Sequence, residues 1–181
     1  CGGHPGRLAV ARLLTNAIAW GFATIEDDVD DLPVIALSPA TAEDSGFVLT
    51  LRNAPETRRW SFSTDDVPEA AHQAWYAETL MGTRRRLFIA TQHGLPVGYA
   101  RLDPQDEWAE VSIAVVPALR GRHLGRAILE VLVREAAALG VRWLRGRILE
   151  DNHASRAVFW KVGFTVEQWS DGVVTMIRRV P

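Results

Sequence analysis

Hydrophobic and polar positions change period several times between residue 32 and the end of the chain. Short apolar or alternating runs, typical of β-strands, occupy residues 32–39, 86–92, 96–103, 107–116, 141–149, 164–169 and 173–179. Longer stretches with helical spacing, or with helix start and stop residues, occupy residues 41–52, 68–81, 124–139 and 152–163. The pattern predicts a strand, two helices, three strands, a helix, a strand, a helix and two final strands, which is an α/β (α+β) arrangement.

The helix predicted over residues 124–139 has the clearest pattern. Gly140 follows it as a helix-ending residue. Its apolar residues repeat at helical spacing, and the buried face that they predict comprises Leu124, Ala127, Ile128, Val131, Leu132 and Leu139. Tight turns are predicted at residues 93–95 and 170–172, because short connections that contain glycine favour hairpins.

Residues 1–31 are interpreted as an N-terminal extension of the main domain, residues 32–181. Within the extension, residues 7–20 have helical spacing and residues 26–31 form an acidic linker. The main domain is long enough to enclose one continuous hydrophobic core.

Composition excludes several classes of protein. The 181 residues are 48% hydrophobic and carry a formal net charge of -2, which gives no overall attraction to nucleic acid or to an acidic membrane. No apolar run approaches the roughly 20 residues of a membrane span. Cys1 is the only cysteine, so no intrachain disulfide can form. A cytoplasmic protein without a metal site is expected, and a homodimer is left open.

The segment RGRHLGR, residues 120–126, follows a predicted strand and opens the helix at residue 124. The unpaired backbone N–H groups of a helix start, together with three arginines, favour binding of a phosphate or pyrophosphate. The alternative is a tight turn whose arginines are solvated. The glycine spacing fits neither a P-loop nor a dinucleotide-binding motif.

Two segments resemble the GCN5-related N-acetyltransferase (GNAT) family. Residues 111–129 resemble its acetyl-CoA motif, Arg/Gln-x-x-Gly-x-Gly/Ala, with Arg120 and Gly125 matching and His123 replacing the usual first glycine. Residues 152–164 resemble its Asn-x-x-Ser/Ala…Tyr-x-Lys-x-Gly-Phe segment. The resemblance covers residues 32–178. It implies the GNAT fold, a mixed, mostly antiparallel sheet flanked by helices, in which two parallel strands splay apart to form the acetyl-CoA cleft.

The resemblance also implies acetyl-CoA as cosubstrate, with no metal. The amides of the turn would hold the pyrophosphate, and the backbone between Ile113 and Val115 would pair with the pantetheine arm. Asn152 would reach that arm from the other side. The residues assigned to the coenzyme on this basis are Ile113, Val115, Arg120, Gly121, Arg122, His123, Leu124, Gly125, Arg126, Asn152 and Phe159.

Acetyl transfer to an amine needs a base, and a donor can protonate the departing thiolate. Glu110 is the candidate base, because members of the resembled family often carry a carboxylate on this strand. The family's usual acid is a tyrosine, and Phe159 at that position cannot donate a proton. Ser155 is the candidate donor, with water, Tyr99 and Tyr76 as alternatives.

The acceptor amine is expected beside the first two helices of the domain. The arginines and aromatic residues there suit a phosphorylated, ring-bearing amine, and they resemble a GNAT subgroup that acetylates nucleotide-linked amino sugars. The residues assigned to the acceptor are Arg52, Asn53, Arg58, Trp60, His72 and Trp75. Two further interpretations stay open. One is acetylation of a peptide or protein amine, and the other is a non-catalytic domain that binds an acyl-CoA and regulates.

Overall fold

The computed structural model describes residues 32–82 and 84–181, and the predicted N-terminal extension lies outside the described residues. The helices and strands in chain order are β1 (Ala36–Pro39), a 3-10 turn (Ala42–Asp44), α2 (Ser45–Asn53), α3 (Pro55–Arg58), α4 (Glu69–Met81), β2 (Arg86–Gln92), β3 (Leu95–Gln105), β4 (Trp108–Val115), a second 3-10 turn (Pro117–Leu119), α5 (Leu124–Ala138), β5 (Trp143–Leu149), α6 (His153–Lys161), β6 (Thr165–Ser170) and β7 (Val173–Arg179). The predicted order is confirmed, with the short helix α3 as an addition.

The strands form one mixed sheet in the order β1-β2-β3-β4-β5-β7-β6. Neighbouring strands are antiparallel except for β4 and β5. The parallel ladder is short, because it pairs only residues 108–110 of β4 with residues 143–145 of β5. Beyond this point the two strands separate, as the resemblance implied, and the backbone edge of β4 that faces β5 leaves the ladder.

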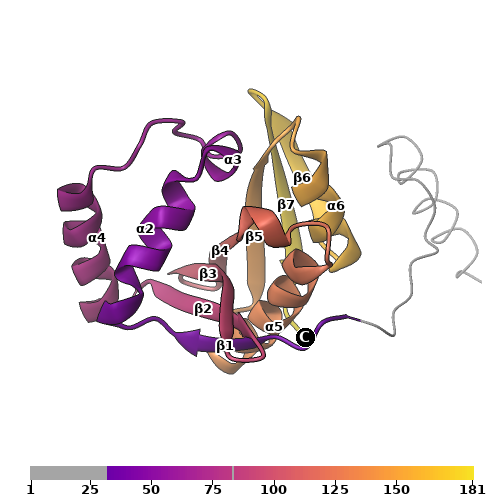
Figure 1. Cartoon of the computed structure of the whole chain (residues 1–181). Helices are drawn as coiled ribbons and strands as arrows, with labels where there is room; N and C mark the ends of the chain where they lie inside the picture. The colour runs from indigo at the N-terminus through magenta and orange to yellow at the C-terminus, as the bar shows by residue number, and fades with distance from the viewer. Residues whose placement is uncertain (1–31, 83) are drawn as a thin grey trace, which may run out of the picture. The chain divides into compact units, whose positions relative to one another are not determined.

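Different helices cover the two faces of the sheet (Figure 1). Helices α2 and α4 lie on one face, where Val48 and Tyr76 share a buried cluster with Leu87 of β2. Helices α5 and α6 lie on the other face, where Ile128 joins Leu102 of β3 in the main hydrophobic core. A ligand between the separated strands would therefore contact elements from both layers.

Helix α5 buries a wider face than the spacing of its apolar residues predicted. Leu124, Ala127, Ile128 and Leu132 are buried as expected. Leu129, Val133 and Ala136 are buried as well. The prediction for Leu139 is wrong, since this side chain is 46% exposed. The helix ends at Ala138, and Leu139 leaves helical geometry with φ -87° and ψ 0°.

Both predicted hairpins form tight turns. His93 and Gly94 have φ values of 51° and 78°, and Asp171 and Gly172 have values of 53° and 73°. Two consecutive residues with positive φ match the right-handed twist of the flanking strands, and glycine and aspartate tolerate this conformation better than most residues.

Within residues 32–82 and 84–181, every helix is too short or too polar to cross a membrane. The same residues contain no group of three or more histidine, cysteine, aspartate or glutamate side chains that could hold a metal ion.

Candidate active site

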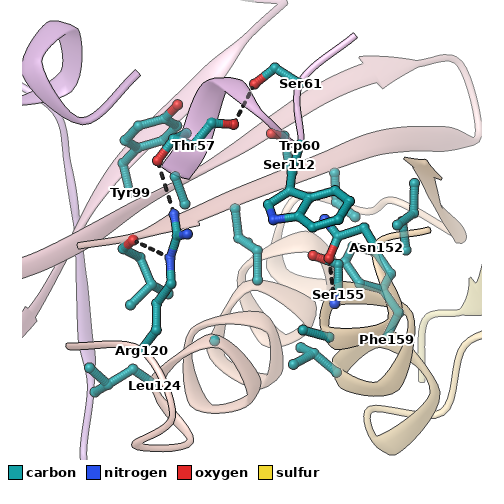
Figure 2. Close-up of a pocket in the computed structure, with 18 of the residues that line it drawn as sticks. Thr57, Trp60, Ser61, Tyr99, Ser112, Arg120, Leu124, Asn152, Ser155 and Phe159 are labelled. Atoms are coloured by element: carbon teal, nitrogen blue, oxygen red, sulfur yellow. Dashed lines mark hydrogen bonds between the residues drawn. The ribbon is translucent and has the colours of Figure 1, made fainter. Parts of the chain in front are cut away.

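A cleft of about 700 Å³ opens where β4 and β5 separate. Its walls come from α2, α3, β3, β4, α5, β5 and α6. Figure 2 shows Trp60 projecting into the cleft. Asn152, which precedes α6, lies on one side with Ser155 and Phe159 of that helix, and Tyr99 and Arg120 lie on the other side. The cleft thus brings together segments that are far apart in the sequence.

The N-terminus of α5 opens into this cleft. Backbone N–H groups in the first turn of a helix have no partner within the helix, and no side chain in the described part of the chain caps this end. Gly121, His123, Leu124 and Gly125 line the cleft beside these groups. The helix dipole adds partial positive charge, so this end of the cleft can hold an anionic group such as a pyrophosphate.

The arginines of the turn are less available than the sequence suggested. Arg120 lines the cleft, but its guanidinium donates hydrogen bonds to the carbonyl oxygens of Val115 (3.3 Å) and Glu56 (3.2 Å) and to Thr57 Oγ1 (3.0 Å). It therefore connects the end of β4 to α3. Arg126 also lines the cleft and pairs with Glu130 at 3.1 Å, whereas the exposed Arg122 is not among the lining residues.

His123 adopts the left-handed conformation that explains the usual glycine at this position. Its φ is 58°, and it precedes the first residue of α5. His123 is exposed although it lines the cleft, so its side chain is not packed into the core.

Replacing His123 by glycine is expected to raise the free energy of unfolding. Left-handed geometry costs a non-glycine residue about 1–2 kcal/mol, and the added freedom of glycine in the unfolded chain offsets about 0.5–1 kcal/mol of that gain. Urea unfolding should therefore show a net gain of about 0.5–1 kcal/mol for His123→Gly and a loss for His123→Val. A loss of stability in His123→Gly would contradict the assigned backbone conformation.

Strand β4 presents different residues to the two layers. Ile113 and Val115 approach Gly125 on the α5 side, since each would lie 3.8 Å from a Cβ added at that glycine. Glu110 and Ser112 lie on the opposite face, as alternation predicted. Glu110 is half-buried, lines the cleft and is the last β4 residue paired with β5. The carboxylate thus comes from the point where the strands separate.

Helix α6 supplies the opposite wall. Asn152 Oδ1 accepts a hydrogen bond from the Ser155 backbone N–H at 3.1 Å, which confirms the predicted helix cap. Asn152 and Ser155 both line the cleft. The Phe159 ring is 4% exposed, packs edge-on against Phe164 and closely overlies Gly146, which has no room for a Cβ.

The two alternative tyrosine donors lie in different places. Tyr76 is buried away from the cleft and donates a hydrogen bond to the Thr41 carbonyl oxygen at 2.7 Å. Burial and the nearby Asp44 carboxylate raise the pKa of Tyr76 to about 12. Tyr99 lines the cleft, and burial raises its pKa, although Arg101 and Arg52 oppose that rise. Tyr99 is therefore neutral and able to donate a hydrogen bond at neutral pH.

The acceptor residues predicted from sequence do not all converge. Arg52 and Trp60 line the cleft, from α2 and from the segment after α3. Asn53 and Arg58 do not line it and instead hold the segment between α3 and α4. The Asn53 amide exchanges two hydrogen bonds with the Val67 backbone, at 3.0 and 2.9 Å, and Arg58 pairs with Asp66 at 3.0 Å.

His72 and Trp75 also lie outside the cleft lining. The His72 ring is buried, and its Nε2 atom lies 3.0 Å from the Ser45 carbonyl oxygen. Trp75 packs on the cluster beneath α2 and α4, with the Arg85 guanidinium 5.5 Å from its ring. These two aromatic side chains stabilise the helical layer, because their spacing on α4 directs them toward α2 and the sheet.

Several cleft residues were not predicted from the sequence, and three of them carry a charged or aromatic side chain from β3, β5 or the segment after α3. Arg101 lies on β3 opposite Ser112, Arg147 lies on β5, and Phe62 lies in the segment after α3. Alternation from Glu110 and its neighbours would have placed Arg101 on the cleft face if the β3–β4 register had been known.

The family model described as an acetyltransferase (GNAT) domain matches residues 35–165. The chain belongs to the GNAT acetyltransferase family. An uncharacterized N-acetyltransferase of Bacillus subtilis, YfmK, is 32% identical over 108 residues, which are 58% of this chain and 73% of that protein. This assignment confirms the family and the enzyme class predicted from the two motifs.

Solved structures confirm the GNAT fold. The spermidine N-acetyltransferase of Vibrio cholerae, in complex with CoA and spermine, superposes with a TM-score of 0.74 at 16% identity, covering 81% of this chain and 95% of that one. The Salmonella typhimurium protein yncA, with acetyl-CoA, has a TM-score of 0.67 at 24% identity and covers 82% and 95%. The comparisons do not support the predicted likeness to GNAT enzymes of nucleotide-linked sugars.

Proposed function

We propose that this GNAT protein transfers the acetyl group of acetyl-CoA to the primary amine of a small molecule. One observation carries the proposal: a single cleft joins the N-terminus of α5, the unpaired edge of β4 and the Glu110 carboxylate. The N-terminus of α5 suits the pyrophosphate of acetyl-CoA, and the unpaired edge of β4 suits the amide groups of its pantetheine arm. The Glu110 carboxylate suits an amine that must lose a proton before it reacts.

In the proposed reaction the amine nitrogen attacks the carbonyl carbon of the thioester directly. The new C–N bond forms, the C–S bond breaks, and the sulfur leaves with the electron pair as CoA thiolate. Glu110 accepts the proton lost by the amine, either directly or through one water molecule. Ser155, on the α6 wall, is the proposed donor of a hydrogen bond or proton to the thiolate. Tyr99 and water are the alternatives.

Replacing Phe159 by tyrosine is expected to change turnover by less than about tenfold, which corresponds to about 1.4 kcal/mol in the barrier. A thiolate is a tolerable leaving group, because the pKa of a model thiol is about 8.5. The ring is packed against Phe164, and a hydroxyl left without a partner would cost about 1–3 kcal/mol of stability. Steady-state turnover and melting temperature of both forms test this. A larger gain in turnover would show that thiolate protonation limits the reaction.

The proposed function is tested by measuring acetyl-CoA binding by titration calorimetry and CoA release with a panel of amines. Binding together with amine-dependent thiol release is the expected result. If the protein binds acetyl-CoA but releases no CoA with any small amine or N-terminal peptide, the enzymatic proposal is overturned. That result would favour an acyl-CoA sensor, and Phe159 at the position of the usual tyrosine would agree with it. Release with peptides alone would assign the acceptor to proteins.

A further inference from the structure

Positive charge exceeds negative charge in the lining of the cleft. The carboxylates are Glu56 and Glu110. The cationic residues are Arg52, Arg101, Arg120, Arg126, Arg147 and Lys161. Part of this charge lies on the turn and helices that face the proposed donor site. The rest comes from α2, β3 and β5, so the excess extends beyond the pyrophosphate site.

Arg52 is the most informative of these residues. Its Nη2 atom donates a hydrogen bond to the Ser63 carbonyl oxygen at 2.9 Å. Its Nη1 atom is buried and has no hydrogen-bond partner in the described structure. A buried guanidinium nitrogen loses the hydrogen bonds that water would supply, and this loss is unfavourable unless another acceptor replaces them. An oxyanion in the cleft becomes such an acceptor once rotation of the Arg52 side chain brings Nη1 to the cleft surface.

Arg101 adds a second positive charge on the same side. It lies 2.9 Å from Asp103, but that carboxylate also pairs with Arg85 at 2.7 Å. Two guanidinium groups therefore share one carboxylate, which leaves a net positive charge beside the cleft. Arg101, Arg52 and Tyr99 all line the cleft, and both arginines oppose the rise in the pKa of the Tyr99 phenol.

The walls around this charge are aromatic. Trp60 and Phe62 line the cleft, and the Arg147 guanidinium lies 4.8 Å from the Phe62 ring. Such walls suit the apolar body of a ligand. A polyamine offers several cations and no anion, so the arginines on this side would repel it.

We propose that the acceptor amine carries an anionic group, a carboxylate or a phosphate, and that Arg52 and Arg101 bind this group on the α2 side of the cleft. This inference rests on the proposed acetyl transfer, because that reaction requires the amine of the acceptor to face Glu110. The amine of such a molecule would point toward Glu110, which lies on the same face of the sheet as Arg101. Arg52 would recognise the anion with its guanidinium group, whose Nη1 atom has no partner among the described residues.

The test compares amines that differ only in the anion. Phenylalanine is paired with phenylalanine amide, and O-phosphoethanolamine is paired with ethanolamine; spermidine is the polycation. Binding to the CoA-saturated protein is measured by calorimetry, and thiol release from acetyl-CoA is measured separately at equal concentrations of neutral amine. Arg52→Gln is the variant, and Arg86→Gln, an exposed arginine outside the cleft lining, is its matched control.

In at least one pair, the anionic member is expected to bind about tenfold more tightly, the gain of one charge-assisted hydrogen bond. Arg52→Gln should remove this preference without changing CoA affinity, and Arg86→Gln should retain it. The pair that responds identifies the anion as carboxylate or phosphate. The inference is overturned if the neutral amines or spermidine bind as tightly as the anionic amines or more tightly, even if the protein acetylates those compounds. Anion-selective binding without thiol release supports the inference and overturns the proposed acetyl transfer instead.

Discussion

Replacing Gly125 by valine is expected to lower acetyl-CoA affinity about a hundredfold or more while the protein stays folded. Gly125 is the second residue of α5, and a Cβ there would meet Ile113 Cδ1, Val115 Cγ2 and Val158 Cγ2 at 3.8 Å. These are ordinary contacts, so the protein itself accommodates the added atom. The Cγ atoms of valine would enter the cleft at the place where the proposed pyrophosphate approaches the backbone. Loss of one or two charge-assisted hydrogen bonds, each about 1.5–3 kcal/mol, accounts for the expected change.

Two other substitutions separate this binding effect from a folding effect. Gly46 is the second residue of α2 and is exposed, and no atom of residues 32–82 or 84–181 lies within 4 Å of a Cβ added there. Gly46→Val therefore makes the same change outside the cleft and should leave the Kd unchanged. Gly125→Ala should bind with intermediate affinity and melt at or above the original temperature, because alanine favours helix over glycine by about 1 kcal/mol. If a folded Gly125→Val protein bound acetyl-CoA with unchanged affinity, the assignment of the pyrophosphate to this end of α5 would be wrong.

Replacing Glu110 by glutamine is expected to lower kcat about 10²–10⁴-fold at neutral pH, the usual contribution of a general base. The amide keeps the shape of the side chain but cannot accept the proton from the amine. Acetyl-CoA affinity should stay the same, because Glu110 lies on the face of β4 opposite Ile113 and Val115. Glu107→Gln is the matched control, since Glu107 is exposed, lies outside the cleft lining and pairs with Arg142 at 2.6 Å.

The pH dependence gives an independent test of the role of Glu110. A free alkyl amine has a pKa of about 10.4, so that little neutral amine is present at pH 7. Raising the pH supplies neutral amine without a base, and the difference between the two forms should shrink between about pH 8 and pH 10. A rate loss that is constant across this range would show that the carboxylate acts by position or charge and not as the base.

The order of the elements could be predicted from the sequence because the signals are local. The two hairpins depend on glycine at a turn, and Asn152 caps α6 through a partner three residues away. The RGRHLGR turn also depends on a local feature, a helix start with free N–H groups. Such features need no information about distant segments, which explains why the turn before α5 and the start of α6 could be located from the sequence.

The acceptor half of the cleft could not be predicted in the same way. His72 and Trp75 have a pattern that suits an aromatic ligand, yet they pack within the α2–α4 layer. Arg101 and Arg147 have no motif, yet the sheet brings them to the cleft. The same residue types occur where a side chain packs against a neighbouring helix and where it faces a cleft. Residue type alone therefore does not show which of the two positions a side chain takes.

By itself the sequence determined the family, the order of helices and strands, and the turn that opens α5; it also supplied the candidate base Glu110. Each of these depends on the spacing of residues that are close together in the sequence, and this spacing can be read without knowledge of the tertiary structure. Only the tertiary structure decided that the β4–β5 ladder ends at Glu110, that Arg120 is bound to α3, and that Arg52 lines the cleft with a nitrogen that has no partner among the described residues. These facts depend on register and packing between segments many residues apart, and the same local sequence is compatible with several such arrangements.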